Sequence, residues 1–544
     1  MADAQYDALI IGGGCSGLIV ANYLALYGGM RTAIFEARHE LGGAWANEEV
    51  TPGFTACTHA AALSDYYTLP LERDFPLKEK GFEYLSYPAA KGAIFKEDHS
   101  SFCIYSAKTD PSGEATARQF GKFSARDADT WLWLWELFQE KVRPVIFQHL
   151  FNPLPPTGEP TRLNKLFQEL CREESSRIDA SMAVKSELAT LRDLFESEAI
   201  IAGLARLNHS ATGLSPDAEG SGLMVLFRMP HMHTETGTWR GGTHSLAHIM
   251  SRIFVEAGGE FFTRAEVDKV IIENGQAQGI RLSDGSEIKA SQLVVSTLDP
   301  VNLCFKLIGK EHLPERLARR VAHLERWRGT LSWYGWAVHE LPDYRAAENE
   351  PDINKTGRIV MVSKDPELMV RNQAWRRLGK MPPELSLSTW AHSSIDNSQA
   401  PEGKHVLGCE EFVLPANRLS EQEWKEFKKK HAQDIIKEWQ GFAPNMSWDN
   451  VISYLPLTPL DCTHASNYGP EGCNIILDCT PNQVRYRPTP ELVHHRTPIK
   501  ALYATGGGWH YGGGAWACSG YNCYKIISQD MSLTKPWQEK GWEF

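Results

Sequence analysis

The 544-residue sequence contains no C-x-x-C pair, although it has 11 cysteines. The missing pair argues against a zinc site, and the odd total favours free thiols in a reducing compartment. The formal net charge of −11 leaves no general basic surface, so we expect no nucleic-acid partner. Residues 8–27 are largely apolar, but no basic residue precedes them, and no apolar run is long enough to span a membrane. The sequence therefore favours a soluble cytoplasmic protein without a metal site and with at most peripheral membrane contact.

A dinucleotide-binding fingerprint lies in the first apolar stretch. Residues 8–11 are apolar and partly β-branched, which predicts a buried strand of a parallel sheet. Gly12 then makes a tight turn, Gly14 leaves room for a pyrophosphate, and Gly17 lets the next helix pack on the strand. That helix begins near Ser16, and its free N–H groups point at the anion.

A second predicted strand, residues 31–35, ends at Glu36, which stands 22 positions after Gly14. A carboxylate at this place accepts hydrogen bonds from a ribose, whereas a basic residue would indicate a 2′-phosphate. Glycines at such spacings also occur in ordinary turns. The strand, helix, second strand and acidic end occur together here, and this combination favours a dinucleotide site.

The run from Glu36 through Arg38 to Gly42 and Gly43 has the form E-x-R-x(3)-G-G. It resembles the second signature of the FAD-binding amine-oxidase and carotenoid-desaturase superfamily. Paired glycines let the backbone pass close to a pyrophosphate and flavin. The family's usual arginine after the glycines is replaced here. The resemblance implies that FAD is the cofactor and that it is contacted by Ala37, Arg38, Gly43, Ala44 and Trp45.

Two later blocks resemble the phytoene-desaturase-like flavoproteins. In residues 237–300, Asn-Gly and Asp-Gly turns predict hairpins, and the strand 292–296 is expected to return to the nucleotide-binding sheet. The resemblance implies that the backbone of Val267 contacts the adenine. Residues 496–514 resemble the closing flavin-binding segment, with a buried strand at 502–505. After that strand, the resemblance implies flavin contacts from Gly506, Gly507, Gly514 and Ala515.

These segments predict an α/β protein in which a Rossmann-type, GR2-like FAD-binding domain is interleaved with a mixed α+β substrate domain. The length suggests at least two closely joined domains. The FAD-binding domain is expected at residues 1–65, 235–305 and 490–535. The substrate domain is expected at residues 66–234 and 306–489, with a helical portion around 126–210 that includes one helix over 188–207.

Two aromatic clusters have competing interpretations. Trp131, Trp133 and Trp135 crowd one helix, which favours a core or pocket position over membrane contact because few basic residues are nearby. In the predicted strand 326–338, alternation places Trp333 on one face and Trp336 on the other. The aromatic residues of one face could therefore contact a ligand. An ordinary sheet core explains that alternation equally well.

The resemblance implies an FAD-dependent desaturase or oxidase that removes a hydride and a proton from adjacent carbons of an apolar or alicyclic substrate, forming a C=C bond. No second strand-linked G-x-G-x-x-G is present, so O2 or a quinone is the expected electron acceptor and not a nicotinamide. A flavin-dependent isomerase or ketolase acting on a polyene is an alternative. A non-catalytic escort-type binding protein of the same fold is another, disfavoured by the intact closing glycine-rich segment.

Three residues are candidates for acid-base work. His510 and Tyr511 stand in the closing glycine-rich segment, where the family usually has proline in place of Tyr511, and His59 follows the first flavin loop. With a ketone substrate, a base would remove the α-proton while the flavin accepts the hydride. A hydrogen-bond donor near the substrate oxygen would stabilise the developing enolate. Hydride loss from an allylic carbon needs little help from a base. Each candidate also has an ordinary structural interpretation of equal weight.

Overall fold

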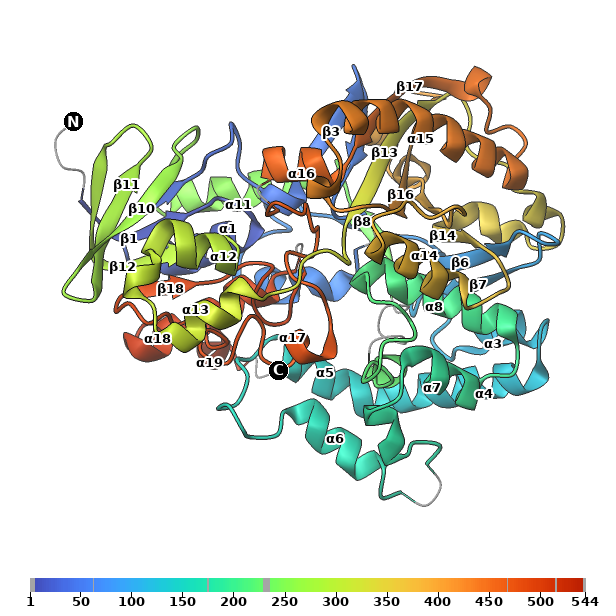
Figure 1. Cartoon of the computed structure of the whole chain (residues 1–544), viewed down its shortest axis with the longest axis horizontal. Coiled ribbons are helices and arrows are strands. Elements are labelled where there is room, and N and C mark those ends of the chain that lie inside the picture. Colours follow the sequence, from blue (N-terminus) through green and yellow to red (C-terminus); the bar gives the residue numbers. More distant parts are fainter. Residues whose placement is uncertain are drawn as a thin grey trace.

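A seven-stranded sheet forms one half of the computed structural model, which describes residues 5–61, 63–173, 176–227, 235–466, 468–513 and 516–541 (Figure 1). β1 pairs in parallel with β2 on one side and with β12 on the other, and β12 also pairs in parallel with β18. Strands buried on both faces read as continuous apolar runs, as residues 8–11 do. The strands of this sheet are β1 (Gln5–Ile11), β2 (Thr32–Phe35), β9 (Glu260–Phe262), β10 (Val267–Glu273), β11 (Gln276–Leu282), β12 (Glu287–Ser296) and β18 (Leu502–Ala504).

Helices cover both faces of this sheet. α1 (Cys15–Leu26) is buried almost throughout because α11 (His244–Glu256) and α18 (Cys518–Asp530) pack on either side of it. Gly520 permits the close approach of α18, since a Cβ there would lie 2.8 Å from the Ser16 carbonyl oxygen. α12 (Pro300–Asn302) leads into a π-helical turn, Leu303–Ile308, that packs on the other face, and α13 (Glu315–Ala322) lies next to it.

A second seven-stranded sheet forms the other half and has the order β17-β13-β16-β15-β14-β6-β7. One face packs against α15 (Glu421–Phe442), and the other packs against α8 (Glu198–Thr212), with α14 (Leu368–Arg377) beside α8. The strands are β6 (Ala89–Phe95), β7 (Ser101–Tyr105), β13 (Leu331–Val338), β14 (Thr356–Val362), β15 (Ser388–Trp390), β16 (His405–Phe412) and β17 (Val451–Leu457).

The segment with the tryptophan cluster is helical. Trp131 and Trp135 are only 1% and 4% exposed and stack on each other, so these two rings belong to the core. Trp133 is half-buried and lies beneath the Arg177 guanidinium. The helices of this part are α3 (Glu114–Gly121), α4 (Ala125–Leu137), α5 (Arg143–Leu150), α6 (Arg162–Leu170), α7 (Glu187–Leu194) and α8.

The single helix expected over 188–207 is two helices, so that prediction was wrong. The Asp127 carboxylate accepts hydrogen bonds from the backbone N–H groups of Glu196 and Ser197, which ends α7 at Leu194. The Ser197 side chain then accepts from the Ile200 N–H and caps α8. The sequence from Leu188 onwards gives no sign of this partner, because Asp127 lies on another helix.

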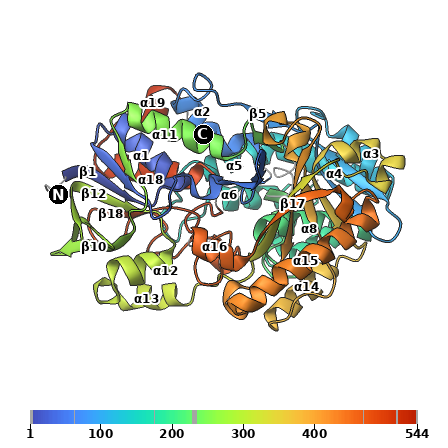
Figure 2. The same cartoon turned by 90° about the horizontal axis from the view of Figure 1, so that it is seen from above.

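Short elements join the two halves, and α16 (Pro459–Ser466) lies between them in both views (Figures 1 and 2). Two small ribbons pair β3 with β4 and β5 with β8. In the described ranges, no helix is long and apolar enough to cross a bilayer. The remaining elements are β3 (Asn47–Thr51), β4 (Phe54–Cys57), β5 (Tyr84–Ser86), β8 (Gly237–Trp239), α2 (Leu69–Asp74), α9 (Met224–Phe227), α17 (Pro481–Val484) and α19 (Pro536–Glu539).

Candidate functional site

Two glycine runs meet at the carboxyl end of β1. The Gly42 N–H donates a hydrogen bond of 2.9 Å to the Gly13 carbonyl oxygen. A Cβ on Gly43 would lie 2.8 Å from the Gly14 Cα, so only glycine allows this backbone approach. At Gly12, φ is +90° and a side chain would overlap the Thr297 hydroxyl. The paired loops therefore form a surface of bare backbone at the start of α1.

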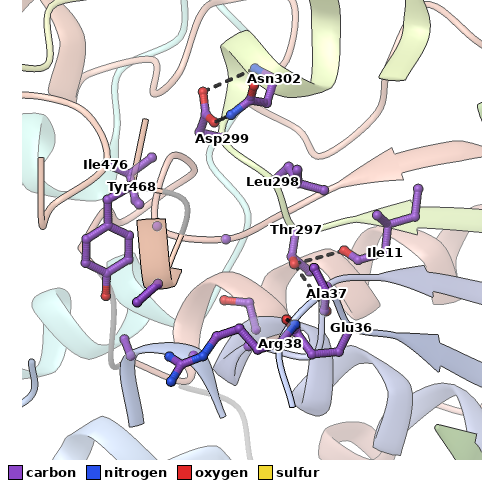
Figure 3. A pocket seen from close by; sticks show the side chains of 18 of the residues that line it. Ile11, Glu36, Ala37, Arg38, Thr297, Leu298, Asp299, Asn302, Tyr468 and Ile476 are labelled. Carbon is purple, nitrogen blue, oxygen red and sulfur yellow. Dashed lines mark hydrogen bonds between the residues drawn. The ribbon is translucent and has the colours of Figure 1, made fainter. Parts of the chain in front are cut away.

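A cavity of about 520 Å³ opens beside these loops, between the two halves of the chain (Figure 3). Tyr468 and Ile476 lie across it from Glu36 and Thr297. The end of β2, the start of β10 and the segment after β18 all contribute to its wall. Most of the predicted cofactor residues line it, namely Gly12, Gly14, Ser16, Glu36, Ala37, Arg38, Gly43, Ala44, Val267, Gly506 and Gly507.

Two of the other four predicted cofactor residues, Gly17 and Trp45, do not line this cavity. Gly17 packs α1 on the strand, since a Cβ there would overlap the Gly12 carbonyl oxygen. Trp45 is fully buried and packs edge-on against Trp239, so it supports the loop from behind. Gly514 and Ala515 lie outside the described residues.

Two backbone donors hold the Glu36 carboxylate in the wall of the cavity. The Gly13 N–H donates to Oε2 at 2.7 Å, and the Arg38 N–H donates to Oε1 at 2.8 Å. Each carboxylate oxygen has further lone pairs, which suit the hydroxyls of a ribose. The geometry is that of an anionic acceptor fixed in place before the ligand arrives.

Several lining residues were not predicted. The Thr297 hydroxyl donates to the Ile11 carbonyl oxygen at 3.0 Å, and Asp299 accepts from Asn302 at 2.5 Å (Figure 3). Tyr468 and Asn474 come from a stretch without a recognisable motif, so no pattern indicated them. Thr297 directly follows the predicted strand 292–296, and this position at the carboxyl end of a strand was the available signal.

A second cavity of about 130 Å³ adjoins the first. The two share Ala44, Tyr468 and Asn474 as lining residues. The Asn474 Oδ1 is buried and has no hydrogen-bond partner in the described structure. A buried amide oxygen left without a donor at the junction of two cavities is suited to a polar ligand that extends from one into the other.

His59 lines the second cavity. Its ring packs edge-on against Trp333 at 4.9 Å and against Tyr468 at 5.6 Å. Burial lowers the pKa of His59 to about 4, with a further decrease from the Arg38 charge, so its imidazole is neutral at physiological pH. The Nδ1 atom has no hydrogen-bond partner among the described residues.

The two candidates of the closing segment are placed differently. Tyr511 lines the second cavity next to Trp516, at a ring distance of 5.6 Å. His510 lines neither cavity, because its imidazole donates from Nε2 to the His149 carbonyl oxygen at 2.8 Å and packs against the His149 ring. Burial lowers the pKa of His510 to about 4. The acid-base roles of both residues stay predictions.

Comparison with known proteins places the glycine loops in a recognised module. Residues 10–69 match the family model described as NAD(P)-binding Rossmann-like domain. Pyridine nucleotide-disulfide oxidoreductase domain-containing protein 2 of Mus musculus is 27% identical, over 97% of this chain and 94% of that protein. One of the limonene dehydrogenase subunits of Castellaniella defragrans is 24% identical, over 98% of this chain and 96% of that protein. A neurosporene-forming phytoene desaturase of Cereibacter sphaeroides is 33% identical over 40% of each chain.

Among solved structures, a triple mutant of putrescine oxidase shares the fold, with a TM-score of 0.60 and 13% identity over 97% of this chain and 99% of that one. At this identity the likeness concerns the fold. The cavity fits FAD, because bare backbone meets the pyrophosphate position, Glu36 meets the ribose position and an unpaired amide oxygen lies at the far end. The cavity and the relatives together indicate an FAD-dependent oxidoreductase, and its fold is like that of putrescine oxidase.

Proposed function

We propose that this oxidoreductase removes a hydride and a proton from adjacent carbons of an apolar or alicyclic substrate and so forms a C=C bond. The observation that carries the proposal is the second cavity, which adjoins the first and has the aromatic rings of Tyr67, Trp333, Tyr468, Tyr511 and Trp516 in its wall. Two relatives named for limonene and phytoene support the same substrate class. Bound FAD would supply the hydride acceptor.

The residues of the second cavity fit the remaining tasks. Tyr67 stacks on Trp516 at 4.1 Å, and together with Trp333 these rings form an apolar wall that excludes water and holds a hydrocarbon body. His59 lines the same space and has a neutral ring. A pKa of about 4 makes His59 a weak base, which suits a proton taken from a carbon next to a developing allylic cation.

O2 or a quinone is proposed as the electron acceptor. The family description names NAD(P), but the matched module, residues 10–69, is already used by the FAD-fitting cavity. The sequence contains no second strand-linked glycine fingerprint. A nicotinamide would therefore need to reach the flavin without a dinucleotide module of its own. An isomerase or ketolase acting on a polyene remains the alternative within the same chemistry.

Product analysis tests the proposal. FAD-loaded protein is incubated in air, or with a soluble quinone, with a panel of alicyclic compounds that includes limonene and cyclohexane derivatives. The expected product has lost two hydrogens and shows a new C=C bond by mass spectrometry and NMR. A His59→Gln variant should retain FAD and form product more slowly. A product of unchanged mass would favour the isomerase, and an added oxygen would favour the ketolase.

A further inference from the structure

A third cavity, of about 820 Å³, lies among α2, β5 and α5. Lys78 and Glu83 of its wall are exposed, so the cavity opens to solvent. Leu69 and Phe147 give the wall an apolar part, and the Arg143 guanidinium lies over the Phe147 ring at 5.4 Å. No described residue lines both this cavity and one of the other two. The dinucleotide site therefore leaves the third cavity unused.

A single chain segment separates the third cavity from the second at one point. Leu63, Ser64 and Tyr67 line the second cavity. Asp65 and Tyr66, which lie between them in the sequence, line the third. Consecutive residues of one segment therefore line both cavities, and the barrier between the two cavities is thin here.

Contacts between aromatic rings cross this barrier. Tyr67 stacks on Trp516 at 4.1 Å in the wall of the second cavity. The Tyr66 ring lies 5.2 Å from the Tyr67 ring and 5.9 Å from the Trp516 ring. On its other side, the Tyr66 ring lies 5.5 Å from the Phe147 ring of the third cavity. A continuous series of ring contacts therefore leads from one cavity to the other.

Hydrogen bonds hold the backbone of this segment at both ends. The Leu63 N–H donates to the Gly237 carbonyl oxygen at 3.2 Å, and the Gly237 N–H donates to the Leu63 carbonyl oxygen at 2.8 Å. The Tyr67 N–H donates to the Ser64 carbonyl oxygen at 3.1 Å, and the Ala517 N–H donates to the Tyr67 carbonyl oxygen at 3.0 Å. Rotation of the tyrosine rings breaks none of these bonds, so the side chains can open the barrier while the chain stays in place.

Two other sides of the second cavity are closed to a substrate that arrives from solvent. One side is shared with the first cavity at Ala44 and Tyr468, and bound FAD would occupy the space beyond it. The second sheet forms another side, where Trp333 and Arg358 are only 2% and 9% exposed. Residues 63–67 form a further side, and the third cavity lies directly behind it. An open cavity behind a thin barrier of side chains is the arrangement expected of a substrate entrance.

We propose that the third cavity is the entrance through which the apolar substrate reaches the second cavity, and that the rings of Tyr66, Tyr67 and Trp516 form the gate between the two. The substrate first binds in the third cavity against Leu69 and Phe147. The gate rings then rotate, the substrate passes into the second cavity, and the rings return and exclude water from it. The inference rests on the proposed function, because it assigns a route to the same substrate cavity.

Binding of p-cymene, which has the carbon skeleton of limonene and a fully aromatic ring, tests the gate without ring oxidation. FAD-loaded protein is mixed rapidly with this probe while the visible flavin spectrum is followed. The dependence of the observed rate on probe concentration gives the association and dissociation rates, and a titration gives the Kd. A gate residue outside the bound position should change both rates by the same factor and leave the Kd unchanged, because it alters the path and not the bound state.

Substitutions at Leu69 and Tyr66 locate the entrance. Leu69→Trp places a large ring in the third cavity and should slow association and dissociation by about 10-fold each, and Tyr66→Ala should accelerate both by about 10-fold. Leu378→Trp, at an exposed position just after α14, is the matched control and should leave both rates unchanged. If Tyr66→Ala loses FAD or fails to fold, Tyr66→Leu replaces it, and Leu69→Trp still decides. Association rates that are unchanged in the folded variants, or a flavin spectrum that does not respond to saturating p-cymene, would overturn the entrance.

The outcomes also separate this inference from the proposed function. Rates that change in the gate variants of a protein that oxidises no apolar or alicyclic compound would retain the entrance and reject the C=C-forming activity. Formation of an unsaturated product from limonene, with association rates that are the same in the wild type and in both gate variants, would retain the activity and reject the entrance.

Discussion

The backbones of Gly14 and Gly43 meet without side chains between them: a Cβ on Gly43 would lie 2.8 Å from the Gly14 Cα. The contact joins the loop after β1 to the loop after β2, two segments that the sequence motifs predict separately. It creates the bare surface on which a pyrophosphate can lie at the N-terminus of α1. A glycine substitution should therefore weaken cofactor binding where the glycine faces the pyrophosphate position, and lower stability where it packs against the protein.

Gly14 and Gly17 provide a matched pair of substitutions. A Cβ on Gly14 has its nearest atom at 3.8 Å, so Gly14→Ala should fold, yet it should weaken FAD binding because its methyl group occupies the pyrophosphate position. Gly14→Val should abolish FAD binding. Gly17→Ala forces a methyl group against the Gly12 carbonyl oxygen, and should lower the unfolding temperature itself. FAD content and thermal unfolding of each purified variant check both effects. Stoichiometric FAD in Gly14→Val would contradict the assignment of this surface to the pyrophosphate.

Glu36 should control retention of the cofactor. Its carboxylate accepts from the Gly13 and Arg38 N–H groups and keeps lone pairs for a ribose. Glu36→Ala removes the acceptor, and we expect the Kd for FAD to rise by about 10-fold or more. Glu36→Gln keeps the shape and should have a smaller effect. The Kd is measured by flavin fluorescence on the apoprotein, and an unchanged value in Glu36→Ala would argue against a ribose contact.

Substitutions at the neighbouring residues Tyr511 and His510 should have different effects on the rate of flavin reduction and on FAD content. Tyr511 lines the second cavity, whereas the His510 imidazole is engaged with the His149 carbonyl oxygen. If an activated-ketone route operates, Tyr511→Phe should slow single-turnover flavin reduction by about 100-fold with FAD retained. His510→Ala should instead destabilise the closing segment and lower FAD content. Unchanged reduction rates in a fully loaded Tyr511→Phe protein would favour the route through an allylic cation.

Acid should destabilise the fold before most carboxylates are protonated. Burial lowers the pKa of several histidines well below the value of about 6.5 that they have in an unfolded chain. The unfolded state therefore binds more protons between about pH 6.5 and pH 4, and stability falls as the pH decreases through this window, by up to about 1.4 kcal/mol per pH unit for each histidine. Glu411, whose pKa burial raises to about 7, acts in the opposite direction. Burial also raises the pKa values of five other carboxyl groups, which act in the same direction as Glu411, namely Glu48, Asp65, Asp74, Glu235 and Glu471. The histidines are His59, His392, His431 and His510, with pKa values of about 4, and His209 and His495, with values of about 3.

Urea unfolding at pH 7 and pH 5 measures this effect. The free energy of unfolding should be clearly lower at pH 5. His431→Gln, a buried substitution on α15 away from both cavities, should reduce the difference between the two pH values. Equal stabilities at pH 7 and pH 5 in the wild type would mean that these histidines are protonated in the folded protein.

The parts of the site that the sequence predicted are those with local causes. The turn at Gly12, the acid at Glu36 and the hairpin that begins at Val267 each follow from residues within one short segment, and each takes its expected place in the fold. Alternation along the strand left open whether the face with Trp333 or the face with Trp336 contacts a ligand. In the folded protein, the packing of the second sheet places Trp333 in the wall of the second cavity. Local rules fix the elements, but the choice between faces depends on the partner sheet and helices.

The unpredicted parts depend on contacts between distant segments. Lys91 and Glu410 are brought into the wall of the second cavity only by the order of strands β6, β14, β15 and β16, and neither residue belongs to a motif. Asn474 reaches the junction of the two cavities from a loop without regular periodicity. The break between α7 and α8 comes from Asp127 on a different helix. In each case the determining partner lies far away in the sequence, where no local pattern can indicate it.

The reaction itself is tested most directly by anaerobic mixing of FAD-loaded protein with a panel of apolar and alicyclic substrates. We expect the flavin absorbance to bleach in a single turnover and to be restored by air or a quinone, and we expect NADH not to bleach it. One molecule of unsaturated product should appear for each flavin reduced. Bleaching by NADH but by no member of the substrate panel would contradict the account, because the chain would then transfer electrons from a nicotinamide and not from a carbon–carbon bond.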